Sequence, residues 1–250
     1  MKYLILMFCL FSFSAHSYDF EGTPEFLFDS SDANSQPETW SQVFELLSVD
    51  GTNTLITSSR PDVLLKPAST MKIFTAWWAI QHSFRSDAYL AEMLKKSVNY
   101  MADDTAQGLG GVLAMEDYYR DQGLPISDDS FQAADGSGLS YSNKTTCKVQ
   151  VELLKLIRRS KDYDRFKKLM AQPGEVGTLL NRLSSLKGRL FAKTGTLKKT
   201  ASLSGFLETN KGTIVFCVLS DFLMIPVSQA RIKIDGILKK NESLVNQSAN

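Results

Sequence analysis

The spacing of apolar residues places strands at the two ends of the chain and helices in its middle. Period-two alternation predicts five strands, at residues 42–49, 54–58, 188–197, 200–208 and 213–222. Helical spacing predicts helices within residues 68–80, 87–122 and 145–170, and a last one that begins at Pro226. We therefore expect an α/β protein in the broad (α+β) sense, whose largely antiparallel sheet is drawn from both ends of the chain and flanked by helices.

The N-terminus has the pattern of a signal peptide. Lys2 precedes an apolar run over residues 3–13, and Ala15-His16-Ser17 is a small-x-small cleavage site. The run has about half of the roughly 20 residues that a membrane-spanning helix needs, so a signal peptide over residues 1–17 is favoured over an anchor. We expect an exported, soluble, periplasmic protein with an irregular segment at 18–40, one domain at 41–240 and a disordered tail at 241–250.

Charge and metal-binding residues exclude several function classes. Removing Lys2 from the 28 basic residues leaves 27 against 27 acidic ones, and this balance does not favour nucleic acid or an anionic membrane as a partner. The predicted mature chain has one histidine, His82, and two cysteines, which give no zinc spacing, so we expect neither metal nor cofactor. Cys147 and Cys217 could form one disulfide, but the position of Cys217 in a predicted strand favours a buried free thiol.

A Ser-x-x-Lys motif opens the predicted helix that follows Pro67. Three residues make almost one helical turn, so Lys72 should project on the same face as Ser69. An amine beside a hydroxyl at a helix N-terminus can produce a serine nucleophile without histidine. On this motif alone, a helix start that carries a solvated lysine would be favoured over a catalytic pair.

Two later motifs favour the catalytic interpretation. Ser97-Val98-Asn99 places a hydroxyl and a carboxamide two residues apart, on a predicted loop between helices. Lys193-Thr194-Gly195-Thr196 lies on a predicted strand, where the lysine and the hydroxyls could meet a carboxylate and the glycine could admit a substrate backbone.

These motifs, in this order, resemble the signature of the penicillin-recognising serine acyl-transferases. Within that superfamily, the chain resembles the D-alanyl-D-alanine carboxypeptidase/endopeptidase family (peptidase family S13, which includes penicillin-binding protein 4) over about residues 40–240. The resemblance rests on five segments: PASTMK, KKSVNYMADDTA, DGSGLS at residues 135–140, the segment at residues 173–179, and GRLFAKTGTL with the following SLSGFL. It implies a β-lactamase/transpeptidase-like fold with a mostly helical sub-lobe.

The resemblance also implies roles for individual residues. Ser69 would be the nucleophile, and Lys72 its base, with a pKa lowered by burial and by Lys193. The leaving amine and the substrate amide would be met by Ser97 and Asn99. The terminal carboxylate would be held by Lys193, Thr194 and Thr196. The oxyanion would be bound by the backbone N–H groups of Ser69 and Thr196. The implied partners are peptidoglycan stem peptides ending in D-Ala-D-Ala, cut as a carboxypeptidase or as an endopeptidase, and β-lactams as inhibitors.

The chain departs from the family pattern at three places. Family members usually carry inserted domains between the first two motifs, whereas Lys72 and Ser97 are only 25 positions apart here. The chain has Tyr141 where the family often has an arginine that contacts the peptide side chain, and Val98 where an acidic residue is common. The chain is therefore predicted to be a minimal catalytic domain.

Two alternatives stay open at this stage. Tyr141-Ser142-Asn143 matches the Tyr-x-Asn motif of some β-lactamases, which makes a β-lactamase or esterase the second enzymatic hypothesis. A β-lactamase that relies on a deacylating glutamate is disfavoured, because no Glu-x-x-x-Asn lies between Ser97 and Lys193. The other alternative is a non-catalytic binding module that keeps the fold and the cleft.

Overall fold

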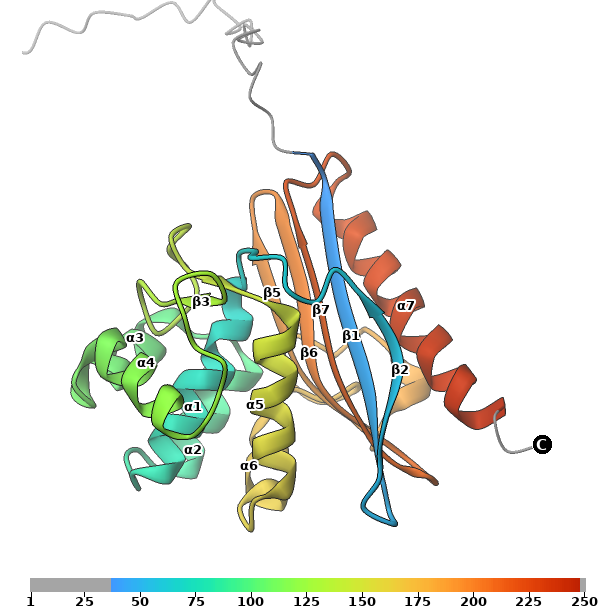
Figure 1. Ribbon diagram of the computed structural model, residues 1–250, viewed down its shortest axis with the longest axis horizontal. Coiled ribbons are helices and arrows are strands. Elements are labelled where there is room, and N and C mark those ends of the chain that lie inside the picture. Colours follow the sequence, from blue (N-terminus) through green and yellow to red (C-terminus); the bar gives the residue numbers. More distant parts are fainter. Residues whose placement is uncertain (1–36, 248–250) are drawn as a thin grey trace, which may run out of the picture. The chain divides into compact units, whose positions relative to one another are not determined.

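The computed structural model describes residues 37–247, which build one five-stranded antiparallel sheet with helices on both faces (Figure 1). The order across the sheet is β2-β1-β7-β6-β5. The strands are β1 (Thr39–Ser48), β2 (Asn53–Ser59), β5 (Leu190–Leu197), β6 (Thr200–Thr209) and β7 (Gly212–Asp221). A short second sheet pairs β3 (Phe131–Gln132) with β4 (Lys144–Thr145). The prediction of an antiparallel sheet made from both ends of the chain is confirmed, because β1 pairs with β7 along its whole length.

Alternation of side chains along the central strands gives the sheet a core on each face. All ten residues of β7 are buried. Val43 and Cys217 face the helical side, whereas Phe44 and Phe216 stack on the opposite side, under the C-terminal helix. A strand buried on both faces requires a layer on each side, and the helices supply those layers.

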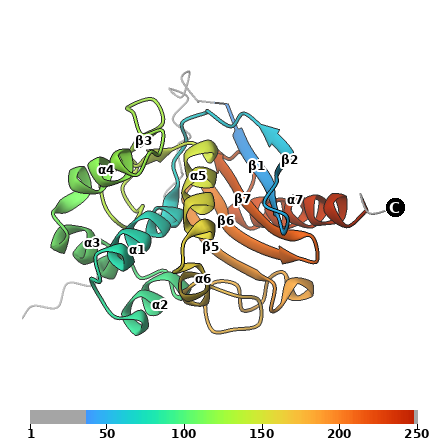
Figure 2. The ribbon, with the colours of Figure 1, turned by 60° about the horizontal axis from the view of Figure 1, so that its bottom comes forward.

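Within residues 37–247, helices α1 to α6 lie on one side of the sheet and α7 lies on the other (Figures 1 and 2). The first group comprises α1 (Lys72–Gln81), α2 (Asp87–Lys95), α3 (Asn99–Gly108), α4 (Gly111–Asp121), α5 (Cys147–Arg159) and α6 (Tyr163–Leu169). The 3₁₀ helix η1 (Ala68–Met71) directly precedes α1, and the 3₁₀ helix η2 (Ser184–Leu186) precedes β5. Helix α7 (Val227–Gln247) covers the other face of the sheet. The predicted helical regions are thus broken into short helices, for example at Gly110 and Gly111, whose φ angles of 109° and 88° favour glycine.

Helix α1 is the central helix of the helical lobe. Nine of its ten residues are buried, as expected of a helix that is apolar on all sides. Trp77 packs edge-on against Phe166 of α6, and the Tyr119 hydroxyl of α4 donates to the Phe74 carbonyl oxygen. The first turn of α1 therefore stands on a rigid support beside the edge strand β5.

The C-terminal prediction was wrong for most of the tail. Helix α7 continues to Gln247, where disorder was expected from Asn241 onward. Asn241 and Val245 are buried, and their contacts with the body of the protein stabilise these last turns. The predicted signal peptide and residues 18–36 lie outside the described residues. None of the helices between residues 37 and 247 combines the length and the apolar character of a membrane-spanning segment.

A disulfide joins the helical lobe to the centre of the sheet. Cys147, the first residue of α5, is bonded to Cys217 of β7, and their Cα atoms are 5.4 Å apart. The predicted free thiol at Cys217 is therefore wrong. Strand alternation correctly indicated burial, but it could not show that the start of a helix 70 positions away lies against the same point.

Replacing both cysteines by alanine is expected to lower the free energy of unfolding by roughly 2 to 4 kcal/mol, because the bridge restricts the unfolded chain over a long loop. Urea unfolding of oxidised wild-type protein and of the Cys147→Ala/Cys217→Ala variant measures this difference. With reductant present throughout, the two proteins should differ much less. Equal stability under oxidising conditions would contradict the assignment of a stabilising bridge.

Candidate active site

Ser69 lies on a 3₁₀ turn, one turn before α1 begins. Pro67 precedes the turn, and Ala68 has a φ of 50°, a left-handed conformation that is strained for alanine. The sequence predicted a continuous helix from Ala68, whereas the α-helix starts at Lys72. In a 3₁₀ turn, side chains three residues apart eclipse each other, so Lys72 lies directly beside Ser69. The Lys72 Nζ is 3.1 Å from the Ser69 Oγ.

The Lys72 amine is fully buried and has three polar neighbours. Besides Ser69, it contacts the Asn99 Oδ1 at 2.8 Å and the Ser137 carbonyl oxygen at 2.7 Å. These two oxygens can only accept hydrogen bonds. A neutral amine that donates its two protons to them keeps its lone pair for the Ser69 hydroxyl proton. This is the geometry that a general base and its nucleophile require.

Burial favours this neutral form. Desolvation lowers the pKa of Lys72 to about 8, and the carboxylates of Asp103 and Asp135 oppose that shift. The sequence predicted that Lys193 would help to lower this pKa. The charge effects on Lys72 come instead from the two aspartates, which limit the fall caused by burial.

The loop that carries DGSGLS positions Lys72. Asp135 accepts hydrogen bonds from the backbone N–H groups of Ser137, Gly138 and Ser140, and from the Asn143 side chain. This set of bonds fixes the turn that directs the Ser137 carbonyl oxygen at the Lys72 amine. DGSGLS, one of the segments that carry the resemblance, therefore contacts Lys72 directly.

Lys193 and Ser97 form a second pair of a lysine and a hydroxyl. The Lys193 Nζ donates to the Ser97 Oγ at 2.8 Å and to the Thr194 carbonyl oxygen at 2.9 Å. The side chain is fully buried, and burial together with the charge of Lys72 holds the pKa of Lys193 well below its ordinary value. Because the Ser97 oxygen accepts from Lys193, the proton of its hydroxyl is available to a bound molecule. Ser97 itself has a φ of 63° and immediately precedes α3.

Gly195 has a different role from the one predicted. It was expected to admit a substrate backbone, but it does not line the pocket. A Cβ on Gly195 would overlap the Ser202 Oγ and would lie 2.8 Å from the Pro67 carbonyl oxygen. The glycine thus lets η1 approach β5, which brings Ser69 to the edge of the sheet.

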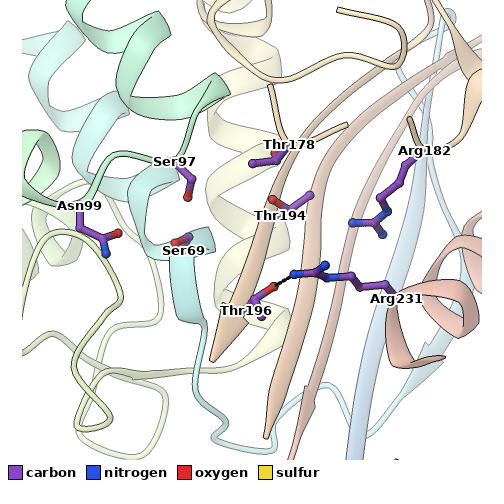
Figure 3. Close-up of a pocket in the computed structure, with 8 residues that line it drawn as sticks. All are labelled: Ser69, Ser97, Asn99, Thr178, Arg182, Thr194, Thr196 and Arg231. Carbon is purple, nitrogen blue, oxygen red and sulfur yellow. Dashed lines mark hydrogen bonds between the residues drawn. The ribbon is translucent and has the colours of Figure 1, made fainter. Parts of the chain in front are cut away.

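One pocket of about 410 Å³ contains most of the predicted site residues (Figure 3). It is lined by Ser69, Ser97, Asn99, Thr178, Arg182, Thr194, Thr196 and Arg231. Lys72 and Lys193 do not line the pocket themselves, but they contact two side chains that do, Ser69 and Ser97. Sequence reasoning missed three of the lining residues: Thr178, Arg182 and Arg231. Only Thr178 lay in a segment that had been singled out, and its Oγ1 is buried without a hydrogen-bond partner among residues 37–247.

The Tyr-x-Asn alternative is not supported by the geometry. Asn143 is fully buried, and its Oδ1 accepts from the backbone N–H groups of Ala134 and Asp135. Tyr141 is about half exposed, and its ring lies 5.0 Å from the Lys66 Nζ. Neither side chain lines the pocket, whose second element is Ser97 with Asn99.

His82 does not line this pocket. His82 follows α1, and its Nδ1 is 2.9 Å from the Trp78 carbonyl oxygen, so this ring caps a helix end. Between residues 37 and 247, no three His, Cys, Asp or Glu side chains come together as a group that could hold a metal ion.

Comparison with known proteins identifies the family. The sequence model of the D-Ala-D-Ala carboxypeptidase 3 (S13) family matches residues 81–241. The chain belongs to this S13 family. The resemblance inferred from the motifs is therefore confirmed. D-alanyl-D-alanine carboxypeptidase DacB of Haemophilus influenzae is 29% identical over 139 residues, which are 49% of this chain and 29% of that protein.

Solved structures of similar proteins show the fold of this S13 chain. Penicillin-binding protein 4 (dacB) from Haemophilus influenzae, complexed with a β-lactam, aligns with a TM-score of 0.52 and 26% identity, over 56% of this chain and 36% of that one. The Bd3459 predatory endopeptidase from Bdellovibrio bacteriovorus aligns with a TM-score of 0.68 over 84% of this chain and 93% of that one, but at 14% identity it shows the fold alone. The predicted β-lactamase/transpeptidase-like fold is confirmed. The chain spans about a third of the length of the Haemophilus proteins.

Proposed function

We propose that this chain is a serine-type D-Ala-D-Ala carboxypeptidase that works through an acyl-enzyme on Ser69. The observation that carries the proposal is the buried Lys72 amine, 3.1 Å from the Ser69 Oγ and held by two oxygens that can only accept. Membership of the S13 family supports the choice of substrate, a peptidoglycan stem peptide ending in D-Ala-D-Ala. The signal-peptide pattern of residues 1–17 supports export to the periplasm.

Acylation begins with transfer of the Ser69 proton to Lys72 as the Ser69 Oγ attacks the carbonyl carbon between the two D-alanines. The bond to the leaving nitrogen then breaks as the Ser97 hydroxyl protonates that nitrogen. The proton that Lys72 took from Ser69 passes to Ser97, whose oxygen is held by Lys193, and Lys72 is neutral again for the next step. Asn99 donates from its amide nitrogen to the substrate backbone. A water molecule finally hydrolyses the ester on Ser69, with Lys72 as base. No cofactor takes part.

The negative charge that forms on the carbonyl oxygen is met by the backbone N–H groups of Ser69 and Thr196. On edge strand β5, the N–H of Ala192 points away from β6 and donates to the Ala171 carbonyl oxygen at 3.0 Å. Because alternate residues of a strand direct their N–H groups to the same side, the N–H of Thr196 faces the same edge. This edge is the one that η1 approaches with Ser69. Two such donors are typical of an oxyanion hole.

A β-lactam would acylate Ser69 in the same way. The amine expelled when its ring opens stays attached to the acyl group and keeps water from the ester, so the adduct would be long-lived. The first test is therefore intact-mass spectrometry of the protein after incubation with benzylpenicillin, with Ser69→Ala beside it. We expect a stable adduct with the mass of the intact drug on the wild-type protein and none on Ser69→Ala.

The fate of the drug distinguishes the alternatives. Rapid destruction of benzylpenicillin by catalytic amounts of folded protein would overturn the proposal in favour of a β-lactamase. Folded wild-type protein that neither forms an adduct nor consumes the drug would indicate a non-catalytic module. Release of D-alanine from a peptide ending in D-Ala-D-Ala, measured with the same preparation, then tests the substrate itself.

A further inference from the structure

Arg231 lies at the end of the pocket opposite the helical lobe. It projects from the second turn of α7, and its Nη2 donates to the Thr196 Oγ1 at 2.9 Å. Figure 3 shows its guanidinium directed toward Thr196, while Ser69, Ser97 and Asn99 approach from the other side. The side chain is exposed to the pocket and to solvent.

The charge of Arg231 has no acidic partner in the described part of the chain. The neighbouring Arg182, by contrast, is paired with Asp235 through contacts of 2.6 and 3.2 Å. Of the two arginines that line the pocket, Arg231 alone is therefore left with an uncompensated charge within residues 37–247. The pocket combines this cation with an open space large enough for part of a peptide.

The bond to Arg231 also sets the direction of the Thr196 hydroxyl. A guanidinium has only donors, so the Thr196 oxygen must accept, and the hydroxyl proton must point elsewhere. Lys193 imposes the same polarity on Ser97, across the pocket. A group that only accepts hydrogen bonds and carries negative charge would satisfy both Arg231 and Thr196. A carboxylate has these properties, and an arginine can bind it with two parallel bonds.

We infer that Arg231, acting directly and through Thr196, binds the free carboxylate of the leaving residue and makes the site selective for substrates that end in a free acid. The inference rests on the proposed function and adds a specificity determinant that none of the three motifs contains. In a peptide ending in D-Ala-D-Ala, the carboxylate is one α-carbon beyond the scissile nitrogen. Thr196 and Arg231 line the same pocket as Ser69, where a carboxylate so close to the scissile bond would lie.

The test compares free acids with matched neutral compounds. The rate constants for acylation of Ser69 by benzylpenicillin and by its methyl ester are measured by intact mass, for the wild-type protein and for Arg231→Ala. We expect Arg231→Ala to lower the acid-to-ester ratio by about 10- to 100-fold, mainly through slower reaction of the acid, because a charge-assisted bidentate contact is lost. Arg231→Lys, which keeps the charge but not the planar fork, should give an intermediate ratio.

Lys233→Gln is the matched control. Lys233 lies on the same helix, two positions further on, but its ammonium is 4.0 Å from the centre of the Trp40 ring and does not line the pocket. This variant removes the same formal charge and should leave the acid-to-ester ratio unchanged. An equal loss in Lys233→Gln and Arg231→Ala, or an unchanged ratio in Arg231→Ala, would overturn the inference.

A binding measurement separates the inference from the proposed chemistry. Calorimetric titration of Ser69→Ala with an N-acetylated peptide ending in D-Ala-D-Ala, and with the same peptide as its C-terminal amide, needs no acylation. Tighter binding of the acid that disappears in Ser69→Ala/Arg231→Ala supports the inference even if the wild-type protein forms no adduct. Equal binding of acid and amide overturns it, whatever the outcome of the acylation test.

Discussion

Replacing Lys72 by alanine is expected to slow acylation of Ser69 by about 10²- to 10⁴-fold, the usual contribution of a positioned general base. The physical reason is that no other amine or imidazole contacts the Ser69 Oγ in the described residues, and Lys72 contacts it at 3.1 Å. The measurement is the rate of adduct formation with benzylpenicillin, followed by intact mass. Circular dichroism and thermal unfolding establish that the variant is folded.

Lys72→Arg is the matched variant. A guanidinium keeps the positive charge but stays protonated at every working pH, so it should fail as a base nearly as completely as alanine. Acylation by Lys72→Arg at more than a tenth of the wild-type rate would contradict the assignment of Lys72 as the base. It would instead suggest that the site needs only a cation beside Ser69.

The pH dependence follows from the same residue. The base is the neutral amine, and burial lowers the pKa of Lys72 to about 8. Acylation should therefore rise as the pH increases through about 8 and level off above it. In Lys72→Ala this inflection should disappear, leaving a slow and flatter profile.

Replacing Gly138 by alanine is expected to lower the free energy of unfolding by about 3 to 5 kcal/mol, among the largest effects of a single substitution. Gly138 has a φ of 79°, and a Cβ at this position would overlap the carbonyl oxygen of Ala68, the residue before the nucleophile. A backbone oxygen cannot move aside as a flexible side chain can. The loop would have to separate from η1, and the Ser137 carbonyl oxygen would then move away from Lys72.

Gly123→Ala isolates the steric part of this effect. Gly123 has a φ of 80°, almost the same as that of Gly138, but nothing lies within 4 Å of the place where its Cβ would be. It should show only the cost of a left-handed alanine, about 1 to 2 kcal/mol. Urea unfolding of both variants gives the comparison. Similar losses in the two would mean that the contact between Gly138 and Ala68 contributes little to stability.

The family and the contact between Ser69 and Lys72 could be predicted from the sequence, because both depend on residues that are close in the chain. Ser69 and Lys72 are three positions apart, so one helical turn places both side chains on the same face. Ser97 and Asn99 are two positions apart, which keeps them close in space but does not by itself direct both side chains into one pocket. The strands could be predicted for a similar reason. Alternation with a period of two reports burial on a sheet without knowledge of the partner strand.

Only the tertiary structure decided which distant groups meet at the site. Lys72 and the Ser137 carbonyl oxygen are 65 positions apart, and Arg231 and the Thr196 hydroxyl are 35 apart. Gly195 was correctly singled out, but the sequence could not show what lies against it. The space beside it is filled by Pro67 and Ala68, from a distant part of the chain, and not by a substrate backbone. Local propensity reports how each segment folds, whereas these contacts depend on tertiary packing. The turn η1 and helix α7 pack against the sheet, and the 135–143 loop packs against η1 and α3, which brings remote segments together.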